Sequence, residues 1–334
     1  MEISPFIQKL PKVELHLHIE GTLEPELKFK LAERNGIQLP QSTPEEVRAT
    51  YDFNDLASFL AVYYDGMNVL RTAEDFYDLA IAYLTKAADQ NVRYVEMFFD
   101  PQAHTSRGVS FDSVIKGLHR AQVEAEKMHG IKSALIMCFL RDFQAEYAMA
   151  TLLEALPYKN WIIGVGLDSD ETGNPPAKFA AVYERARQEG FMLTMHADVD
   201  IKNSIDHIGQ LINDIKVDRI DHGTNVLEKP EYVQHLVDNG IGLTCCPVSN
   251  TWVSDGSKTK LIKQLAEQGV KVTVNSDDPA YFAGYISENF QLLADELQAD
   301  EQFLAQLSLN AVDISWATPT FKEQLREEIR ATLA

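Results

Sequence analysis

Two histidines near the start of the chain, His16 and His18, have a spacing that suggests chemistry. They lie two positions apart in the apolar stretch KVELHLH, so on a β-strand both side chains point to the same face. An imidazole buried on an apolar face needs partners for its nitrogens, because an unpaired polar group is costly in the interior. A metal ion is one such partner, and His196 and Asp277 are further candidate ligands. Three imidazoles and one carboxylate suit a divalent cation, zinc first, and leave a position open for water.

These residues stand at or near the ends of short apolar stretches that recur along the chain. The stretches are residues 12–18, 92–100, 133–142, 161–168, 191–198, 219–223, 241–250 and 271–278. Segments with apolar residues at three- and four-residue spacing lie between them and indicate amphipathic helices: 73–89, 111–129, 177–188, 203–214 and 258–268. Near-continuous apolar strands that alternate with helices predict parallel strands covered by helices.

Seven of these eight stretches close at or near a histidine or an acid, which favours a closed barrel over an open sheet. In a (β/α)8 barrel the carboxyl ends of all strands surround one mouth, so distant residues converge there. A doubly wound sheet usually carries a glycine-rich turn after its first strand, and this chain has none there. We predict an α/β fold, a (β/α)8 TIM-type barrel formed by residues 1–334 as a single domain. Residues 19–91 are too long for one crossover and predict extra helices over the mouth.

The composition indicates the cellular compartment of the protein and the kinds of partner that it can bind. The chain has 30 Lys and Arg against 50 Asp and Glu, a net charge of −20, which would repel the phosphates of nucleic acids. Its three cysteines, Cys138, Cys245 and Cys246, cannot all pair and favour a reducing compartment. No secretion signal and no membrane-length apolar run is seen. We therefore expect a cytoplasmic protein with no nucleic-acid or membrane partner; its oligomeric state stays open, a homo-oligomer included.

The opening string PKVELHLHIEGTLEPEL resembles the adenosine/adenine deaminase family of the amidohydrolase superfamily. Further strings resemble the family in the same order: VEMFFDPQAHTSRG, VGLDSDETGNPPAKF, RIDHG, CPVSN and VNSDDPAYFAGYISENF. The similarity runs from about residue 8 to about residue 310, and the forms HIEGTLEPE, DPQAHT and LDSDE are closest to bacterial adenine deaminases. The resemblance implies a barrel with one Zn²⁺ per chain that hydrolyses the exocyclic amine of a small purine-type substrate, adenine or an adenine-like amine.

The resemblance also implies a role for each matching residue. It assigns the zinc to four ligands: His16, His18, His196 and Asp277. In the implied reaction, hydroxide held by the metal attacks the amino-bearing ring carbon, while His222 and Asp277 handle the protons of that water. Substrate contacts are implied for three acids: Asp278 at a ring nitrogen, Glu20 beside the paired histidines, and Glu171 in LDSDE.

One position departs from the family. The family has a glutamate three residues after the histidine of the fifth strand, and this acid protonates the ring; here Val199 stands there and has no proton to give. General acid catalysis contributes about 10²–10⁴-fold, so the change matters. Three hypotheses stay open: Asp198 or Asp200 replaces the acid, the enzyme takes a different substrate, or the protein binds metal without turnover. Asp198 and Asp200 could instead cap a helix that begins near Asn203, and for Asp200 this alternative stands level with catalysis.

Overall fold

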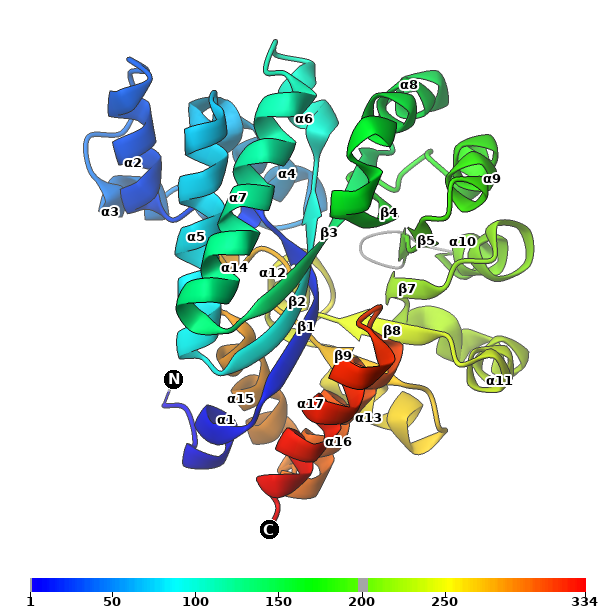
Figure 1. Ribbon diagram of the computed structural model, residues 1–334. Coiled ribbons are helices and arrows are strands. Elements are labelled where there is room, and N and C mark those ends of the chain that lie inside the picture. The colour runs from blue at the N-terminus through cyan, green and yellow to red at the C-terminus, as the bar shows by residue number, and fades with distance from the viewer. Residues whose placement is uncertain (1, 198–203) are drawn as a thin grey trace.

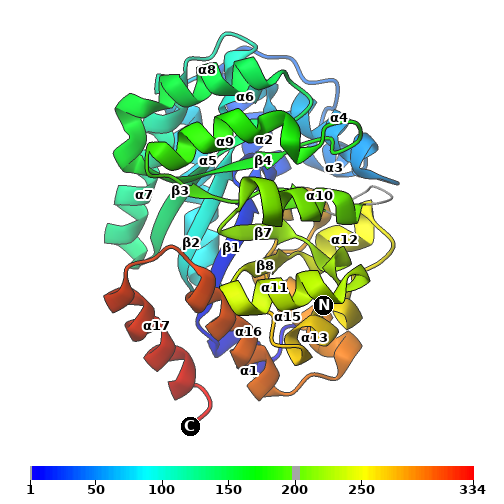
Figure 2. The same cartoon turned by 90° about the vertical axis from the view of Figure 1, so that its right-hand side faces the viewer.

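Parallel strands line the centre of the molecule, and helices surround them (Figures 1 and 2). This computed structural model describes residues 2–197 and 204–334. In that part of the chain the strands are β1 Lys12–His18, β2 Val92–Phe99, β3 Lys132–Leu140, β4 Ile162–Asp168, β5 Met192–Leu193, β6 His196–Ala197, β7 Arg219–His222, β8 Gly242–Cys245 and β9 Val272–Val274. Strands β1 to β5 form one parallel sheet in chain order, and β6 to β9 form a second. The predicted α/β barrel with parallel strands is confirmed.

The fifth strand is interrupted, which the sequence did not predict. A single strand is expected over residues 191–198, yet β5 and β6 are two residues long each, with Thr194 and Met195 between them. Backbone hydrogen bonds still join this segment to both neighbours: the Thr194 N–H donates to the Val165 carbonyl at 3.0 Å, and the Asp221 N–H donates to the Met195 carbonyl at 3.0 Å. The break therefore leaves the first seam between the two sheets closed.

The second seam is closed by the backbone of Asp277. Its N–H donates to the His16 carbonyl at 3.1 Å, and its carbonyl accepts from the His18 N–H at 2.9 Å. Asp277 reaches both because its φ is +62°, in the left-handed region that costs a non-glycine residue about 1–2 kcal/mol. The backbone that completes the barrel thus belongs to a candidate metal ligand.

The helices pack outside the strands and over their ends. They are α1 Pro5–Lys9, α2 Pro25–Arg34, α3 Pro44–Arg48, α4 Leu56–Gly66, α5 Ala73–Asp89, α6 Pro101–Thr105, α7 Phe111–His129, α8 Ala145–Ala155, α9 Ala180–Gln188, α10 Ser204–Gln210, α11 Pro230–Asn239, α12 Pro247–Val253, α13 Thr259–Glu267, α14 Pro279–Phe282, α15 Ile286–Leu297, α16 Glu301–Ile314 and α17 Pro319–Ala331. Within the described ranges, no helix combines the length and apolar character that a membrane crossing requires.

Two strands end earlier than their apolar stretches, and a short helix that begins with proline follows each of them. The stretch 241–250 is strand only to Cys245, and 271–278 only to Val274. Pro247 and Pro279 are the first residues of α12 and α14. Proline lacks the N–H that a central strand needs, and its φ suits the first turn of a helix. The polar residues after each strand are therefore turned over the mouth of the barrel.

The extra helices expected between the first two strands are α2 to α5. Helix α4 begins at a capping box, in which the Asp55 side chain accepts from the Ser58 N–H and the Ser58 side chain from the Asp55 N–H. Its side chains line the same pocket as the strand-end histidines. The expectation that this region covers the mouth is confirmed.

Candidate active site

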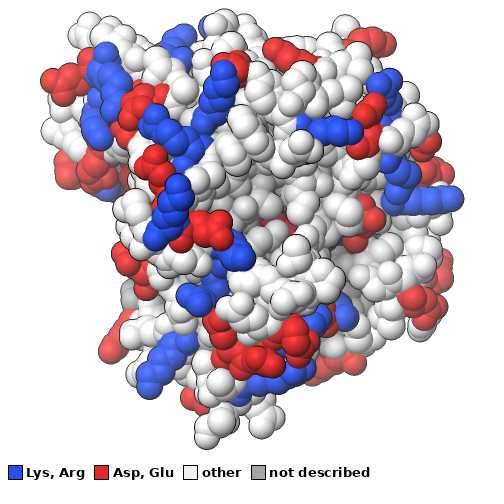
Figure 3. Space-filling view, viewed as in Figure 1, with Lys and Arg blue, Asp and Glu red and all other residues white. Residues whose placement is uncertain are grey.

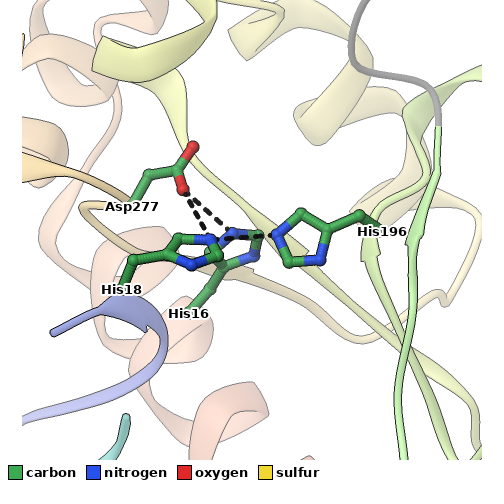
Figure 4. A group of neighbouring side chains, drawn as sticks. All are labelled: His16, His18, His196 and Asp277. Atoms are coloured by element: carbon green, nitrogen blue, oxygen red, sulfur yellow. Dashed lines mark hydrogen bonds and ion pairs between the residues drawn. The ribbon is translucent and has the colours of Figure 1, made fainter. Parts of the chain in front are cut away.

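Four side chains converge at the carboxyl ends of the strands (Figure 4). Their candidate ligand atoms all lie within 4.8 Å of one another. Asp277 Oδ1 is 3.1 Å from His16 Nε2 and 3.4 Å from His18 Nε2. The Nε2 atoms of His18 and His196 are 3.1 Å apart. The structure thus brings together the residues that the sequence predicts as metal ligands, two from β1, one from β6 and one after β9.

The hydrogen bonds around His16 determine which of its nitrogens can bind a metal. The Thr244 hydroxyl donates its one hydrogen to Asp221 Oδ1 at 2.9 Å. It must therefore accept from His16 Nδ1, which is 2.9 Å away. His16 then carries its proton on Nδ1, and the Nε2 lone pair points toward Asp277. Histidines that bind metals usually donate their other N–H in this way.

His18 and His196 each have a carboxylate near Nδ1. His18 Nδ1 lies 3.3 Å from Asp168 Oδ2, and His196 Nδ1 lies 3.5 Å from Asp221 Oδ2, where within the described residues it forms no hydrogen bond. With the proton of each ring on Nδ1, both Nε2 lone pairs would point to the centre of the group. Two lone pairs 3.1 Å apart repel each other, and a proton or a metal ion between them removes that repulsion.

The carboxylates around His18 favour a positive charge at this place. Burial opposes protonation of His18, but Asp278, Asp168 and Asp277 outweigh it and raise the pKa of the imidazole to about 10. For Asp277, burial is outweighed by His16, His222 and His18, which hold the pKa of the carboxyl well below its usual range. A divalent cation supplies this positive charge as well as protons do, so the charges and the donor set fit a metal ion.

His222, the last residue of β7, faces the same centre. Its φ is +63°, and this turn brings the ring beside His16, with the ring centroids 4.6 Å apart. His222 Nε2 lies 3.9 Å from Asp277 Oδ2, which also accepts from the Ser249 hydroxyl at 2.7 Å. Burial, and next to it His16, lowers the pKa of His222 well below its usual value. A neutral imidazole at this position can accept a proton.

Asp278 is fitted closely against the turn that follows β1. A Cβ on Gly21 would come within 2.1 Å of Asp278 Oδ1, so only glycine allows this approach. Asp278 is 4% exposed, and burial raises the pKa of its carboxyl well above the usual value. A protonated carboxyl can donate a hydrogen bond as well as accept one.

The pocket above these residues has an apolar wall and an acidic floor. Its volume is about 40 Å³, and it is lined by His18, Leu56, Phe59, Leu60, Tyr63, Tyr64, Asp100, Asp168, Ser169, His196, His222, Ser249, Val253, Asp277, Asp278 and Phe282. One face of α4 contributes to the apolar wall, and residues at the strand ends form the acidic floor. Among the described residues that line the pocket there is no lysine or arginine. Such a pocket suits a flat, uncharged ring.

Glu20 is buried behind the lining of the pocket. Its Oε1 accepts from the Asp100 N–H at 3.1 Å and lies 2.8 Å from His104 Nε2. Arg107 Nη2 donates to His104 Nδ1 at 2.7 Å, so the histidine proton is on Nε2 and is donated to Glu20. Glu20 is not among the described residues that line the pocket. Asp100 does line it, and Glu20 holds Asp100 through the hydrogen bond from the Asp100 N–H.

Glu171 is also buried beside the pocket instead of lining it. Glu171 Oε2 lies 3.5 Å from His207 Nδ1 and 3.8 Å from Arg141 Nη1. The same Arg141 nitrogen donates to the His196 carbonyl at 2.9 Å, which steadies the interrupted fifth strand. Asp198 and Asp200, the two acids predicted near the missing glutamate, lie outside the described residues, as does Val199.

The sequence did not identify three residues that support the site, Thr244, Asp221 and Ser249. Asp221 holds Thr244 by a hydrogen bond and lies near His196, and Ser249 holds Asp277. Each lies in or beside a stretch that the sequence analysis had already singled out, such as RIDHG or CPVSN. A search for acids and hydroxyls next to strand-end ligands would have found them.

Comparison with known proteins agrees with this geometry. The adenosine deaminase family model matches residues 11–332. A deaminase of Schizosaccharomyces pombe is 50% identical over 99% of this chain and 98% of its own length. The adenine deaminase of Rhodospirillum rubrum is 48% identical over 99% of both chains. The crystal structure of adenine deaminase from Arthrobacter aurescens has a TM-score of 0.92 at 42% identity and covers 97% of this chain and 99% of that one. The chain therefore belongs to the adenosine deaminase family of the amidohydrolase superfamily and is an enzyme of the hydrolytic deaminase class.

Proposed function

We propose that the protein is a zinc-dependent deaminase of a free purine base, adenine or an N6-substituted adenine. The observation that carries this proposal is the convergence of the metal-ligand group, His222 and Asp278 on one pocket without a lysine or arginine among its described lining residues. The similarity to adenine deaminases of Rhodospirillum rubrum and Arthrobacter aurescens supports the choice of substrate.

Zinc is the metal that suits this donor set best. Three imidazole nitrogens and one carboxylate oxygen, all buried, match the ligands of catalytic zinc sites. When bound, the ion would lower the pKa of a water ligand from about 15.7 toward about 7 and so supply a nucleophile at neutral pH. The bonds from His16 to Thr244 and from His18 to Asp168 would hold two ligand rings in the orientation that binding requires.

His222 and Asp277 would move the protons of the reaction. Burial lowers the pKa of His222 well below its usual value, and its Nε2, 3.9 Å from Asp277 Oδ2, would take a proton from the attacking water. The same proton can then pass to the leaving amine, which departs as ammonia. Ser249 donates to Asp277 Oδ2 and keeps that oxygen directed at the reacting atoms.

Asp278 would bind the purine ring. Its carboxyl lines the pocket, and burial raises the pKa of that carboxyl, so that in its protonated form it could donate to a ring nitrogen and in either form accept from a ring N–H. The aromatic side chains of Phe59, Tyr63 and Phe282 supply apolar surface for the ring faces. Glu20 and Glu171 remain proposals for substrate contact; through Asp100 and Arg141 they also support the walls of the pocket.

The lining of the pocket argues for a base over a nucleotide. Four of its residues are aspartates, and the described lining residues include no lysine or arginine that could pair with a phosphate group. A charged group that enters such a site without a partner loses its hydration and is repelled. The chain should therefore discriminate strongly against phosphorylated substrates.

The source of the proton for the ring nitrogen divides the proposal into two forms. Either Asp198 or Asp200 supplies it, or the true substrate is an amine that does not need it. In the first form, Asp198→Asn or Asp200→Asn, whichever residue supplies the proton, should abolish adenine deamination, and Val199→Glu should raise it by returning an acid to this position. In the second form adenine turns over poorly and another N6-amine turns over well.

The deciding experiment measures ammonia released from adenine, N6-substituted adenines, adenosine and AMP by protein that carries one zinc per chain. We expect at least one free base to reach a kcat/KM of about 10⁴ M⁻¹s⁻¹ or more, with adenosine and AMP far below it. If AMP or adenosine is the best substrate, the proposed preference for a free base is wrong. If no amine is released although zinc is bound, the protein binds metal without turnover.

A further inference from the structure

A buried thiol lies beside the candidate metal ligands. Cys246 caps the N-terminus of α12, and its Sγ forms a group with a nitrogen of His222 and an oxygen of Asp277. These three atoms all lie within 4.8 Å of one another. None of the three residues is more than 6% exposed. Asp277 belongs both to this group and to the four candidate zinc ligands, whereas Cys246 and His222 belong to this group alone.

The two oxygens of Asp277 face different neighbours. Oδ1 is 3.1 Å from His16 Nε2 and 3.4 Å from His18 Nε2. Oδ2 lies 3.9 Å from His222 Nε2. A carboxylate directed at two sets of ligands can bridge two cations, which in two-metal sites lie about 3.5–4 Å apart. Asp277 has this arrangement, with the zinc ligands on one side and His222 on the other.

His222 and Cys246 are not held by strong hydrogen bonds of their own. Within the described part of the chain, the buried His222 Nδ1 has no hydrogen-bond partner. The Cys246 thiol makes one weak contact, to the Thr244 carbonyl at 4.0 Å. Both side chains can therefore turn toward a bound ion without breaking a strong hydrogen bond.

We propose that Cys246, His222 and Asp277 form a second metal site, which takes a soft divalent cation such as Cd²⁺ or excess Zn²⁺ and thereby stops turnover. A thiolate with an imidazole selects such cations over Mg²⁺ or Ca²⁺, which prefer oxygen ligands. The cation replaces the thiol proton, which is released to solvent. The loss of turnover rests on the proposed function, because the ion would occupy His222 and one oxygen of Asp277. The binding itself does not depend on that function.

Cadmium binding to protein that carries one zinc per chain tests the site directly. Bound cadmium and zinc are both measured after equilibrium dialysis. Cadmium that replaces zinc at the four candidate zinc ligands is then seen as a loss of zinc. A cadmium thiolate also absorbs in the ultraviolet. We expect the wild type to take up one Cd²⁺ per chain with this absorption and to keep its zinc. Cys246→Ser and Cys246→Ala should lose both signals, whereas the matched control Cys245→Ala, at the neighbouring buried cysteine, should retain them.

Inhibition is measured in parallel, with each variant compared with its own activity at one zinc per chain. Excess Zn²⁺ or Cd²⁺ should inhibit the wild type and Cys245→Ala, and a chelator at low concentration should reverse this; the Cys246 variants should resist inhibition. The inference is wrong if the wild type binds no second ion, or if Cys246→Ser binds it as tightly and with the same absorption. A second ion that depends on Cys246, in a protein that deaminates no purine base, would support the site and contradict only the proposed function.

Discussion

Two residues of the site have a left-handed backbone conformation, which is uncommon outside glycine. His222 and Asp277 lie at φ values of +63° and +62°, and such a conformation costs about 1–2 kcal/mol each. At both positions the left-handed turn directs the side chain into the centre of the barrel. Without this turn the side chain would point elsewhere. His222 follows Asp221, and neighbouring strand residues normally face opposite sides. Here both reach the interior, which gives the site a base beside its ligand support.

His222→Ala should lower kcat by about 10²–10⁴-fold, since the variant lacks the group that handles the protons of the attacking water. Zinc content should stay at one per chain, because His222 is not one of the four ligands of the first site. Steady-state kinetics and elemental analysis of the same sample provide the measurement. His235→Ala, on α11 outside the barrel, is the matched control. Normal turnover in His222→Ala would remove His222 from the mechanism.

The pH profile should report the protonation state of His222. His222 acts as a base, so activity should fall as the pH drops through its pKa. Burial places that pKa well below the usual value of about 6.5, and a cation nearby would lower it further. The acidic limb of kcat should therefore lie below pH 6.5, with full activity at pH 7. A limb centred above pH 7 would contradict a buried neutral imidazole as the base.

At the scale of elements, the longest helices between strands and most strands could be predicted because their periodicity is clear, whereas short helices such as α6 and α12 were not predicted. The expected helices 73–89 and 111–129 agree with α5 and α7, whose ends are set by caps at Thr72 and Ser110. The break between β5 and β6 could not be predicted, because every residue of 191–197 is apolar or buried and periodicity carries no signal there. The partners of Glu20 and Glu171 also could not be predicted, since they depend on residues distant in the sequence.

Helix α4 should control which amines fit. Leu60 is only half-buried and faces the pocket, so Leu60→Ala should enlarge it without a large loss of packing. We expect kcat/KM for adenine to fall by about tenfold or more, while bulkier N6-substituted adenines lose less or gain. Competition between the two substrates measures this ratio. Leu153→Ala, at an exposed leucine of α8, should leave the ratio unchanged; an unchanged ratio in Leu60→Ala would show that α4 does not select the substrate.

At the scale of the whole molecule, the candidate metal ligands come from both sheets. His16 and His18 belong to the first sheet, His196 belongs to the second, and Asp277 follows its last strand.

Acidic and basic side chains are interspersed on the face shown in Figure 3, although the net charge is −20. The predictions of a single domain over residues 1–334 and of no nucleic-acid partner stay predictions.

Removal of the metal should weaken the whole barrel. An ion at 100 times its Kd stabilises the folded state by about 2.7 kcal/mol, so a chelator should lower Tm by several degrees and zinc should restore it. Calorimetry with and without chelator gives the measurement. His196→Ala lacks a ligand from the second sheet, and its Tm should respond much less. An equal Tm for wild type with and without metal would mean that the ion does not join the sheets.

The position of α4 has a consequence for the rate of the enzyme. With α4 among the elements over the mouth, the candidate ligands and Asp278 are at most 6% exposed, so a purine reaches them only when residues around the pocket move apart. Each catalytic cycle then contains at least one opening step that involves no chemistry. Such steps take microseconds to milliseconds and often limit turnover through product release. A good leaving group in place of the amine would then hardly raise kcat, whereas added viscosogen would lower it.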